Sequence, residues 1–305
     1  MAHTLLENIT ENQDRFAAIH NERIGSSRIA AICGLNKYET PLQVWAKMTG
    51  KVGADPQNDA MWLGHEMQPV IGRLFVRRQN IPIETEDSVY YLPEKEWAIA
   101  SPDFTLPDGG LLEAKNTGSW AREIWADGVP DAAHCQVQWQ MGIVRAPYAY
   151  VAALCGGRVD DFFIHRIDFN EEVFNQLLER GERFMALVKS ETPPDAMHGD
   201  DDLVSLLAGK LEDRAVNLSQ DEYPALTQYQ NLSAQKKGLM SEAAELKEQM
   251  EAIQNRLRLI GNGASVLRCG GLEMHIKLRT RAGYEAKASE WYEYKVKESS
   301  GAAHE

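Results

Sequence analysis

The most constraining segment of this sequence is SPDFTLPDGGLLEAKN, residues 101–116. Apolar runs separated by Pro, Asp and Gly predict two strands joined by a turn at residues 107–109. Asp103 precedes the turn, and Glu113 and Lys115 follow it. Because side chains alternate along a strand, Glu113 and Lys115 share one face. A hairpin would therefore bring Asp103 close to Glu113.

Two neighbouring carboxylates favour a bound cation, because they repel each other unless a positive charge lies between them. Oxygen ligands suit Mg²⁺ or Mn²⁺, and the carbonyl of Ala114 would add a third ligand. Lys115 would then orient a water molecule and favour its deprotonated form, as metal-assisted attack on a phosphodiester requires. The alternative is a surface hairpin in which Glu113 and Lys115 form a weak ion pair.

The order Pro-Asp, followed ten positions later by Glu-x-Lys, matches the PD-(D/E)xK nuclease signature. Residues 24–50, IGSSRIAAICGLNKYETPLQVWAKMTG, resemble the opening of the phage exonucleases of the lambda-exonuclease and YqaJ type. Residues 134–144, HCQVQWQMGIV, resemble the Gln-x-Gln helix of the same proteins. The resemblance spans about residues 20–190. It implies an α/β fold with a restriction-endonuclease-like PD-(D/E)xK core, whose mixed central sheet is flanked by helices.

The resemblance also implies roles for single residues. Asp103 and Glu113 would ligate the metal together with the Ala114 carbonyl, and Lys115 would assist the attacking water. The family usually has a Glu four residues after the Gly of WLGHEMQPVIGRLF, where this chain has Gln68. We therefore expect a further metal contact from Gln68 or, if the helix register shifts, from a neighbour such as Glu66 or His65.

Ser27 and Gln136 match family positions that contact the terminal 5′-phosphate of the substrate. A Ser at a helix N-terminus suits that role, because free backbone N–H groups bind phosphate. An Arg shares the family's pocket, and Arg23 is the first candidate here and Arg28 the second. The alternative for Ser27 is a simple helix N-cap.

The implied function is Mg²⁺-dependent 5′-to-3′ exonuclease action on double-stranded DNA, starting at 5′-phosphorylated ends and leaving 3′ overhangs for phage-type recombination. The expected partners are duplex ends and a single-strand annealing protein, and the expected assembly is a homo-oligomer, a trimer by resemblance. Two alternatives remain open. One is a structure-selective or restriction-like endonuclease on the same core, and the other is a non-catalytic DNA-binding or scaffolding protein with a degenerate site.

The formal net charge of -13 excludes a protein that coats nucleic acid with its whole surface, but not an enzyme with one basic groove. The four cysteines form no CxxC pair and no zinc-ligand spacing, so we expect free thiols in a reducing cytoplasm. No apolar run approaches the roughly 20 residues of a membrane span, and the polar N-terminus lacks the features of a secretory signal. We therefore expect a cytoplasmic protein without membrane contact.

Local patterns predict the secondary structure of the nuclease-like part. We expect Ser26 or Ser27 to cap a helix over residues 26–34, and Pro41 to open the next helix. Further helices are expected over 59–79, 132–144 and 169–190, and strands over 88–93, 97–106, 110–116, 149–155 and 160–169. Three tryptophans lie near the proposed site, and we interpret them mainly as packing residues although base stacking is an alternative: Trp120, Trp125 and Trp139.

The C-terminal third has a different pattern of apolar residues. Apolar positions between 225 and 260 alternate by four and three, which predicts a heptad-patterned helix with one charged break at Lys236. It would either form a coiled coil or pack on the nuclease domain. The predicted domains are a YqaJ-like exonuclease domain (1–195), an acidic linker (196–222), a long helix (223–260), a small β appendage (261–297) and a disordered tail (298–305).

Overall fold

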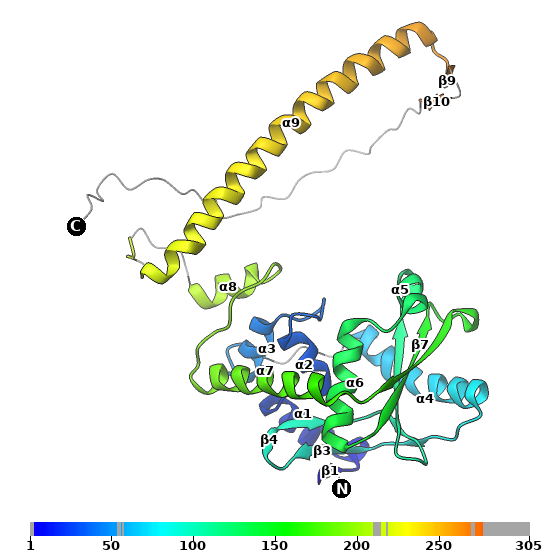
Figure 1. Ribbon diagram of the computed structural model, residues 1–305, viewed down its shortest axis with the longest axis vertical. Helices are drawn as coiled ribbons and strands as arrows, with labels where there is room; N and C mark the ends of the chain where they lie inside the picture. Colours follow the sequence, from blue (N-terminus) through cyan, green and yellow to red (C-terminus); the bar gives the residue numbers. More distant parts are fainter. Residues whose placement is uncertain are drawn as a thin grey trace. The chain divides into compact units, whose positions relative to one another are not determined.

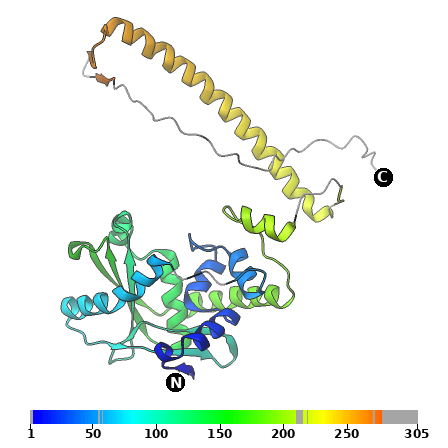
Figure 2. The same ribbon diagram turned by 180° about the vertical axis from the view of Figure 1, so that it is seen from behind.

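The computed structural model describes residues 3–53, 56, 58–209, 215–217, 219–269 and 272–276. The chain divides into two compact units, Met1–Leu211 and Glu212–Glu305. The first unit holds the candidate nuclease motifs, and the second holds the long helix (Figures 1 and 2). The domain boundaries suggested by the sequence stay a prediction. The predicted disordered tail, residues 298–305, lies outside the described residues.

The first unit alternates helices and strands. Its strands are β1 (His3–Glu7), β2 (Glu84–Thr85), β3 (Ser88–Leu92), β4 (Lys95–Ala100), β5 (Phe104–Thr105), β6 (Leu111–Thr117), β7 (Tyr148–Cys155) and β8 (Phe162–Asp168). Its α-helices are α1 (Gln13–Glu22), α2 (Ser26–Ile32), α3 (Pro41–Met48), α4 (Asp59–Gln79), α5 (Arg122–Asp127), α6 (Asp131–Val144), α7 (Glu171–Lys189) and α8 (Asp201–Ala208).

A five-stranded mixed sheet forms the centre of this unit, in the order β2-β5-β6-β7-β8. β6 and β7 are parallel, and the other three pairings are antiparallel. The helix α6 is the crossover that a parallel β6–β7 pair requires. The prediction of an α/β fold with a mixed sheet flanked by helices is confirmed.

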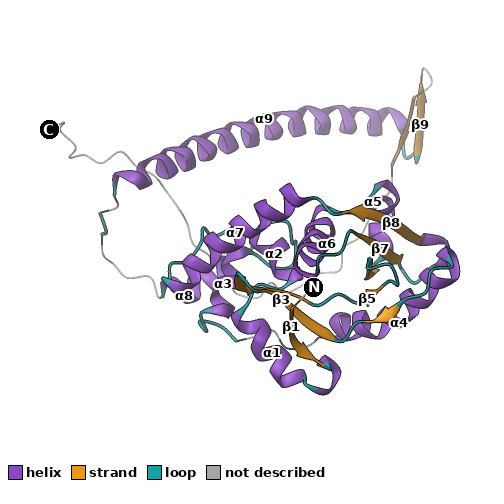
Figure 3. Ribbon diagram, turned by 60° about the horizontal axis from the view of Figure 1, so that its bottom comes forward, coloured by secondary structure: helices purple, strands orange, loops and turns teal. Residues whose placement is uncertain are grey.

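Helices cover both faces of this sheet, as Figures 1 and 3 show for α4 and α6. On one face, Ile71 and Phe75 of α4 pack against Leu112. On the other face, Val137 of α6 packs against Leu111. Neighbouring residues of β6 thus belong to different cores, which follows from the alternation of side chains along a strand. Glu113 and Lys115 have the parity of Leu111 and therefore face α6.

A second, smaller sheet has the order β1-β3-β4 and is antiparallel throughout. The expectation of one strand over residues 97–106 is wrong, because that segment divides into β4 and β5. Pro102 lies between them and has no N–H to donate to a ladder. β4 consequently pairs in the small sheet and β5 in the mixed sheet.

Local hydrogen bonds at the N-caps fix where several helices begin. Thr40 and Gln43 form a capping box at α3, with Pro41 in the first turn as expected. Asn58 caps α4 by accepting from the N–H of Met61. The expected cap of α2 is wrong: its N-cap is Gly25 and not a serine. Ser27 therefore lies in the first turn of α2, and its side chain is exposed.

The second unit contains α9 (Tyr223–Gly261), followed by the antiparallel pair β9 (Val266–Cys269) and β10 (Leu272–His275). No residue of α9 is buried. Asn262 ends the helix in a left-handed conformation, with φ of 44°. In the described part of the chain, no helix is both long enough and apolar enough to cross a membrane.

Candidate active site

The hairpin of β5 and β6 places the two carboxylates of the motif together. β5 pairs with β6 in the register Phe104 with Leu112, and continuing it by one residue sets Asp103 opposite Glu113. The Ala114 N–H donates a hydrogen bond of 2.8 Å to Asp103 Oδ2. Asp103 is therefore held directly on β6, although it lies just outside the ladder.

Glu113 is the centre of the site, and it is only 4% exposed. Its Oε1 atom accepts hydrogen bonds from Lys115 Nζ at 2.7 Å and from Gln136 Nε2 at 2.6 Å. Its Oε2 atom accepts one from Gln140 Nε2 at 2.9 Å. Lys115 Nζ also donates to Gln136 Oε1 at 2.7 Å. Three donors thus compensate the burial of this carboxylate.

The two glutamines reach Glu113 because they lie one helical turn apart on α6. Gln138, between them in the sequence, points away: it donates to the carbonyl of Asp168 and accepts from the N–H of Asn170. The sequence predicted a role for Gln136 but assigned none to Gln140. The sequence pattern that could have identified Gln140 is its i,i+4 spacing from Gln136, which puts both residues on the helix face that meets β6.

The electrostatics of the site follow from two acids and one amine in a small volume. Burial, and secondly the charge of Glu113, raise the pKa of Asp103 well above its usual value. The hydrogen bond from the Ala114 N–H and the charge of Lys115 lower this pKa, but their effect is smaller. Burial alone would lower the pKa of Lys115, but Glu113 and Asp103 outweigh it and the pKa is raised. Lys115 is therefore held as an ammonium group.

These residues fit a divalent cation. Asp103 and Glu113 offer carboxylate oxygens and Ala114 a carbonyl oxygen, a donor set that suits Mg²⁺ or Mn²⁺. The raised pKa of Asp103 shows an electrostatic conflict that a cation would relieve. Gln140 Oε1 is a buried acceptor without a hydrogen-bond partner. Within the described residues, no group of three or more His, Cys, Asp or Glu side chains is placed to hold a metal.

Gln68 is the α4 residue that contacts the acids. Its Nε2 atom donates a hydrogen bond of 3.0 Å to Asp103 Oδ1. The side chains of His65 and Glu66 are exposed. Glu66 is two positions from Gln68, so it projects from a different side of the helix. Of the alternatives raised by the sequence, Gln68 is the one beside Asp103.

A pocket of about 570 Å³ opens beside Lys115, and both Ser27 and Gln136 line it. Arg23 and Arg28 are not among its lining residues. Arg28 donates to the backbone carbonyls of His20 and Arg23, and Arg23 donates to that of Glu96. Ser27 and Gln136 thus line one pocket, whereas the two arginines bind backbone carbonyls and do not line it. The role of these residues in binding a 5′-phosphate stays a prediction.

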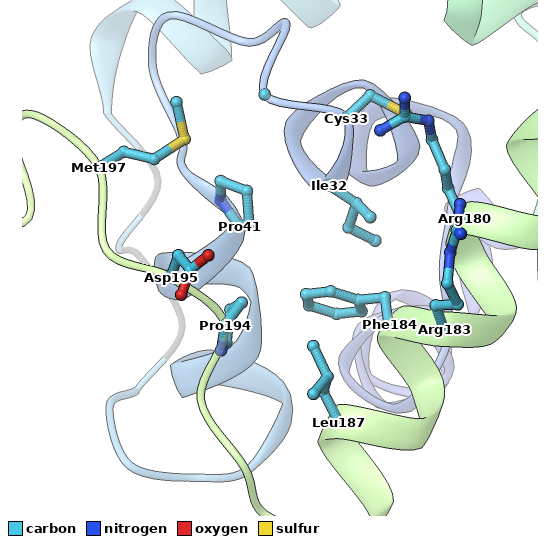
Figure 4. A pocket seen from close by; sticks show the side chains of 11 residues that line it. Ile32, Cys33, Pro41, Arg180, Arg183, Phe184, Leu187, Pro194, Asp195 and Met197 are labelled. Atoms are coloured by element: carbon cyan, nitrogen blue, oxygen red, sulfur yellow. The ribbon is translucent and has the colours of Figure 1, made fainter. Parts of the chain in front are cut away.

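A separate pocket of about 500 Å³ lies among α2, α3 and α7 (Figure 4). Phe184 and Leu187 line it beside Arg180 and Cys33. Figure 4 shows the Arg180 side chain beside Cys33. None of the predicted site residues lines this pocket. Three described cysteines are free thiols: Cys33, Cys135 and Cys155.

Comparisons with known proteins agree with the motifs. Residues 15–147 match the family model of the YqaJ-like viral recombinase domain. The predicted resemblance to the YqaJ type is confirmed. The protein YqaJ of Bacillus subtilis (strain 168) is 25% identical over 261 residues, covering 82% of this chain and 81% of that protein. The YqaJ-matching range contains every residue assigned to the candidate site.

Two solved structures resemble part of this chain. The crystal structure of LHK-Exo in complex with dAMP matches with a TM-score of 0.51 at 20% identity, covering 64% of this chain and 97% of that chain. A second structure is that of the alkaline exonuclease LHK-Exo from Laribacter hongkongensis, with a TM-score of 0.49, 21% identity, and coverage of 59% and 94%. The first likeness shows that the YqaJ-like unit shares a fold with LHK-Exo.

Proposed function

We propose that this protein is a PD-(D/E)xK nuclease that hydrolyses phosphodiester bonds in double-stranded DNA. The observation that carries the proposal is the convergence of Asp103, Glu113 and Lys115 on one hairpin, with Lys115 Nζ 2.7 Å from Glu113. The match to the YqaJ-like viral recombinase domain and the fold shared with LHK-Exo support it.

In this proposal Asp103, Glu113 and the Ala114 carbonyl hold Mg²⁺ or Mn²⁺. When bound, the cation would polarise the scissile phosphate and lower the pKa of the attacking water. Lys115 keeps its proton, so it acts as a fixed positive donor that orients the water and stabilises negative charge. Gln136 holds the Lys115 ammonium group in place, and both glutamines orient Glu113.

We further propose a polarity. Ser27 and Gln136 would bind a terminal 5′-phosphate in the pocket beside Lys115. Hydrolysis would then proceed 5′ to 3′ from duplex ends and leave 3′ overhangs for recombination with a single-strand annealing protein. The proposed site of action is the cytoplasm, that of the host cell if the protein is encoded by a phage.

The test is digestion of linear duplexes with 5′-phosphate or 5′-hydroxyl ends, in Mg²⁺ or in EDTA. We expect Mg²⁺-dependent release of nucleotides and faster digestion of the phosphorylated end. A covalently closed plasmid should stay intact, and its cleavage would indicate an endonuclease instead. Metal-independent DNA binding without any turnover would indicate a scaffolding protein and contradict the proposal.

The protein is also proposed to form a homo-oligomer through α9. The apolar seam side chains Leu232, Leu239, Leu246, Met250 and Ile253 are each more than half exposed. A helix of 39 residues with no buried side chain needs a packing partner to be stable. The charges beside the seam favour a parallel arrangement of the α9 helices, because Glu242 of one copy would then face Lys247 of another. By the family resemblance, we propose that this assembly is a trimer.

A further inference from the structure

Large apolar side chains stand exposed around the pocket beside Lys115. Four large apolar residues of its lining are exposed: Tyr38 at 78%, Trp120 at 59%, Leu35 and Ile124. Exposed apolar side chains gathered at one concave site indicate a binding surface, whereas scattered ones do not. The lining also contains the polar residues Ser27, Lys115 and Gln136.

Trp120 differs from the two other tryptophans near the site. Trp125 and Trp139 are 5% and 0% exposed and belong to hydrophobic cores, which confirms the packing interpretation for those two. Trp120 lies in a short 3-10 helix (Ser119–Ala121) directly after β6. Its exposure leaves it available to a ligand.

The indole of Trp120 is held in place by its neighbours. A Cβ atom on Gly118 would come within 2.5 Å of Trp120 Nε1, so the bare glycine allows the ring to lie against the backbone. Lys37 Nζ lies 3.3 Å from the Trp120 ring centroid and 4.8 Å from that of Tyr38. The electron-rich face of an aromatic ring attracts such a cation electrostatically.

We infer that Trp120, with Tyr38, stacks on the nucleobase of the 5′-terminal nucleotide, whose phosphate binds Ser27 and Gln136 in the same pocket. The inference rests on the proposed function and adds a base-contacting element to it. A nucleotide has one flat apolar part and one anionic part, and the lining of this pocket contains the aromatic rings of Tyr38 and Trp120 together with the ammonium group of Lys115. Stacking tolerates every base, because each has a π-face.

Lys37 has a defined part in this contact. In the free protein its ammonium group occupies one face of the Trp120 ring. A base that takes this face displaces the ammonium group, which then becomes available to a backbone phosphate. The expected specificity is therefore for a base of any identity, with a salt-dependent contribution from Lys37.

The test is a double-mutant cycle between the protein and the DNA. One duplex carries an ordinary 5′-phosphorylated nucleotide, and the other carries a 5′-phosphorylated abasic residue at the same position. Dissociation constants are measured by fluorescence anisotropy in EDTA, so that binding is read without turnover. For the wild type, we expect removal of the base to weaken binding about tenfold, as for loss of one stacked base.

In Trp120→Ala the two duplexes should bind equally, and Trp120→Phe should restore part of the difference. Gly118→Ala should also reduce it, because the added Cβ displaces the ring without deleting it. Trp62→Ala is the matched control: Trp62 is 54% exposed on α4 but does not line the pocket, so the tenfold difference should persist. Circular dichroism checks that each variant is folded.

Equal binding of the two duplexes by the wild type would overturn the inference, as would an equal loss for both duplexes in Trp120→Ala. Parallel digestions in Mg²⁺ separate this result from the proposed function. If the wild type digests DNA and Trp120→Ala leaves base discrimination unchanged, only the stacking contact is wrong. If the wild type binds both ends but never hydrolyses them, the proposed function is wrong, and the cycle still reports on the base contact.

Discussion

Lys115 Nζ and Glu113 Oε1 are 2.7 Å apart, and the two residues lie on the same face of β6. Gln136 bridges them, because it accepts from Lys115 and donates to Glu113. The amine is therefore oriented by an acid and an amide at once. Its raised pKa keeps it charged across the pH range in which nucleases are assayed.

Replacement of this amine should abolish hydrolysis while preserving DNA binding. We expect Lys115→Ala to lower kcat at least about 100-fold, the usual effect of removing one group that stabilises transition-state charge. KM should change much less. Lys115→Arg keeps the charge and should retain more activity than Lys115→Ala. Single-turnover digestion measures the rate, and anisotropy in EDTA measures binding. Unchanged turnover in Lys115→Ala would contradict the proposed catalytic role.

Divalent cations should stabilise the fold through Asp103. Because the folded pKa of Asp103 is raised, the metal-free fold favours the neutral acid and loses stability as pH rises through that pKa. A cation binds the ionised form, so its affinity should increase with pH. At about 100 times its Kd, Mg²⁺ should add about 2.7 kcal/mol to the free energy of unfolding.

Thermal unfolding with and without Mg²⁺, at several pH values, measures this effect. Asp103→Asn should unfold at the same temperature in both conditions, since the amide cannot replace the charged ligand. Asp108→Asn is a suitable control, because Asp108 lies in the turn of the same hairpin and bonds Tyr148. A wild-type protein that gains no stability from Mg²⁺ or Mn²⁺ would contradict the metal site.

Much of this site follows from local sequence, and the rest depends on distant partners. The predicted helix over residues 59–79 coincides with α4, because Asn58 caps it and Asn80 ends it in a left-handed conformation. The strand–turn–strand pattern likewise gave the neighbouring positions of Asp103 and Glu113. These features depend on short-range hydrogen bonds, which sequence patterns encode.

By contrast, β4 pairs with β3 in a sheet completed by β1, near the start of the chain. No local pattern in the polar N-terminal segment indicated β1, and the sequence predicted β4 and β5 as one continuous strand. Gln140 was missed for a similar reason. Its contact with Glu113 depends on which face of α6 meets the sheet, and that is decided by the packing of Val137 and Met141.

Substitution of Gln68 tests the departure from the family pattern. Gln68 donates to Asp103, so Gln68→Glu replaces a donor by a third carboxylate. We expect the metal-free protein to lose stability, by about 1 kcal/mol or more, because like charges then meet in a partly buried site. With Mg²⁺ bound, the variant should instead be more stable than the wild type, because it should bind the ion more tightly. Isothermal titration calorimetry measures the affinity, and Glu66→Gln, on an exposed position, should leave it unchanged.

His20 should make stability depend on pH below neutrality. Burial and then the charge of Arg28 lower the pKa of His20 from 6.5 to about 4. The fold therefore favours the neutral ring, so the contribution is complete above pH 6.5 and is lost as pH falls toward 4. We expect a loss of about 2 kcal/mol across this window, discounted for partial exposure.

Urea unfolding of the wild type and of His20→Gln between pH 7 and 4 measures this loss. Only the difference between the two curves reports on His20, because Asp103 titrates in the opposite sense. The variant should lie below the wild type at pH 7 and approach it at pH 4. Parallel curves would mean that the ring is not held neutral by the fold.

The exposed seam of α9 predicts an assembly that depends on its leucines. Leu239 and Leu246 occupy successive d-type positions, so Leu239→Glu with Leu246→Glu places two charges from each copy at the centre of the seam. We expect light scattering after size exclusion to show the monomer mass for this variant and an oligomer for the wild type. Glu248→Ala, on the outer side of the helix, should keep the wild-type mass. In Leu246→Cys, oxidation should link copies efficiently only if the helices lie parallel and in register. A monomeric wild type would contradict the prediction, because the seam would then have no second copy as its partner.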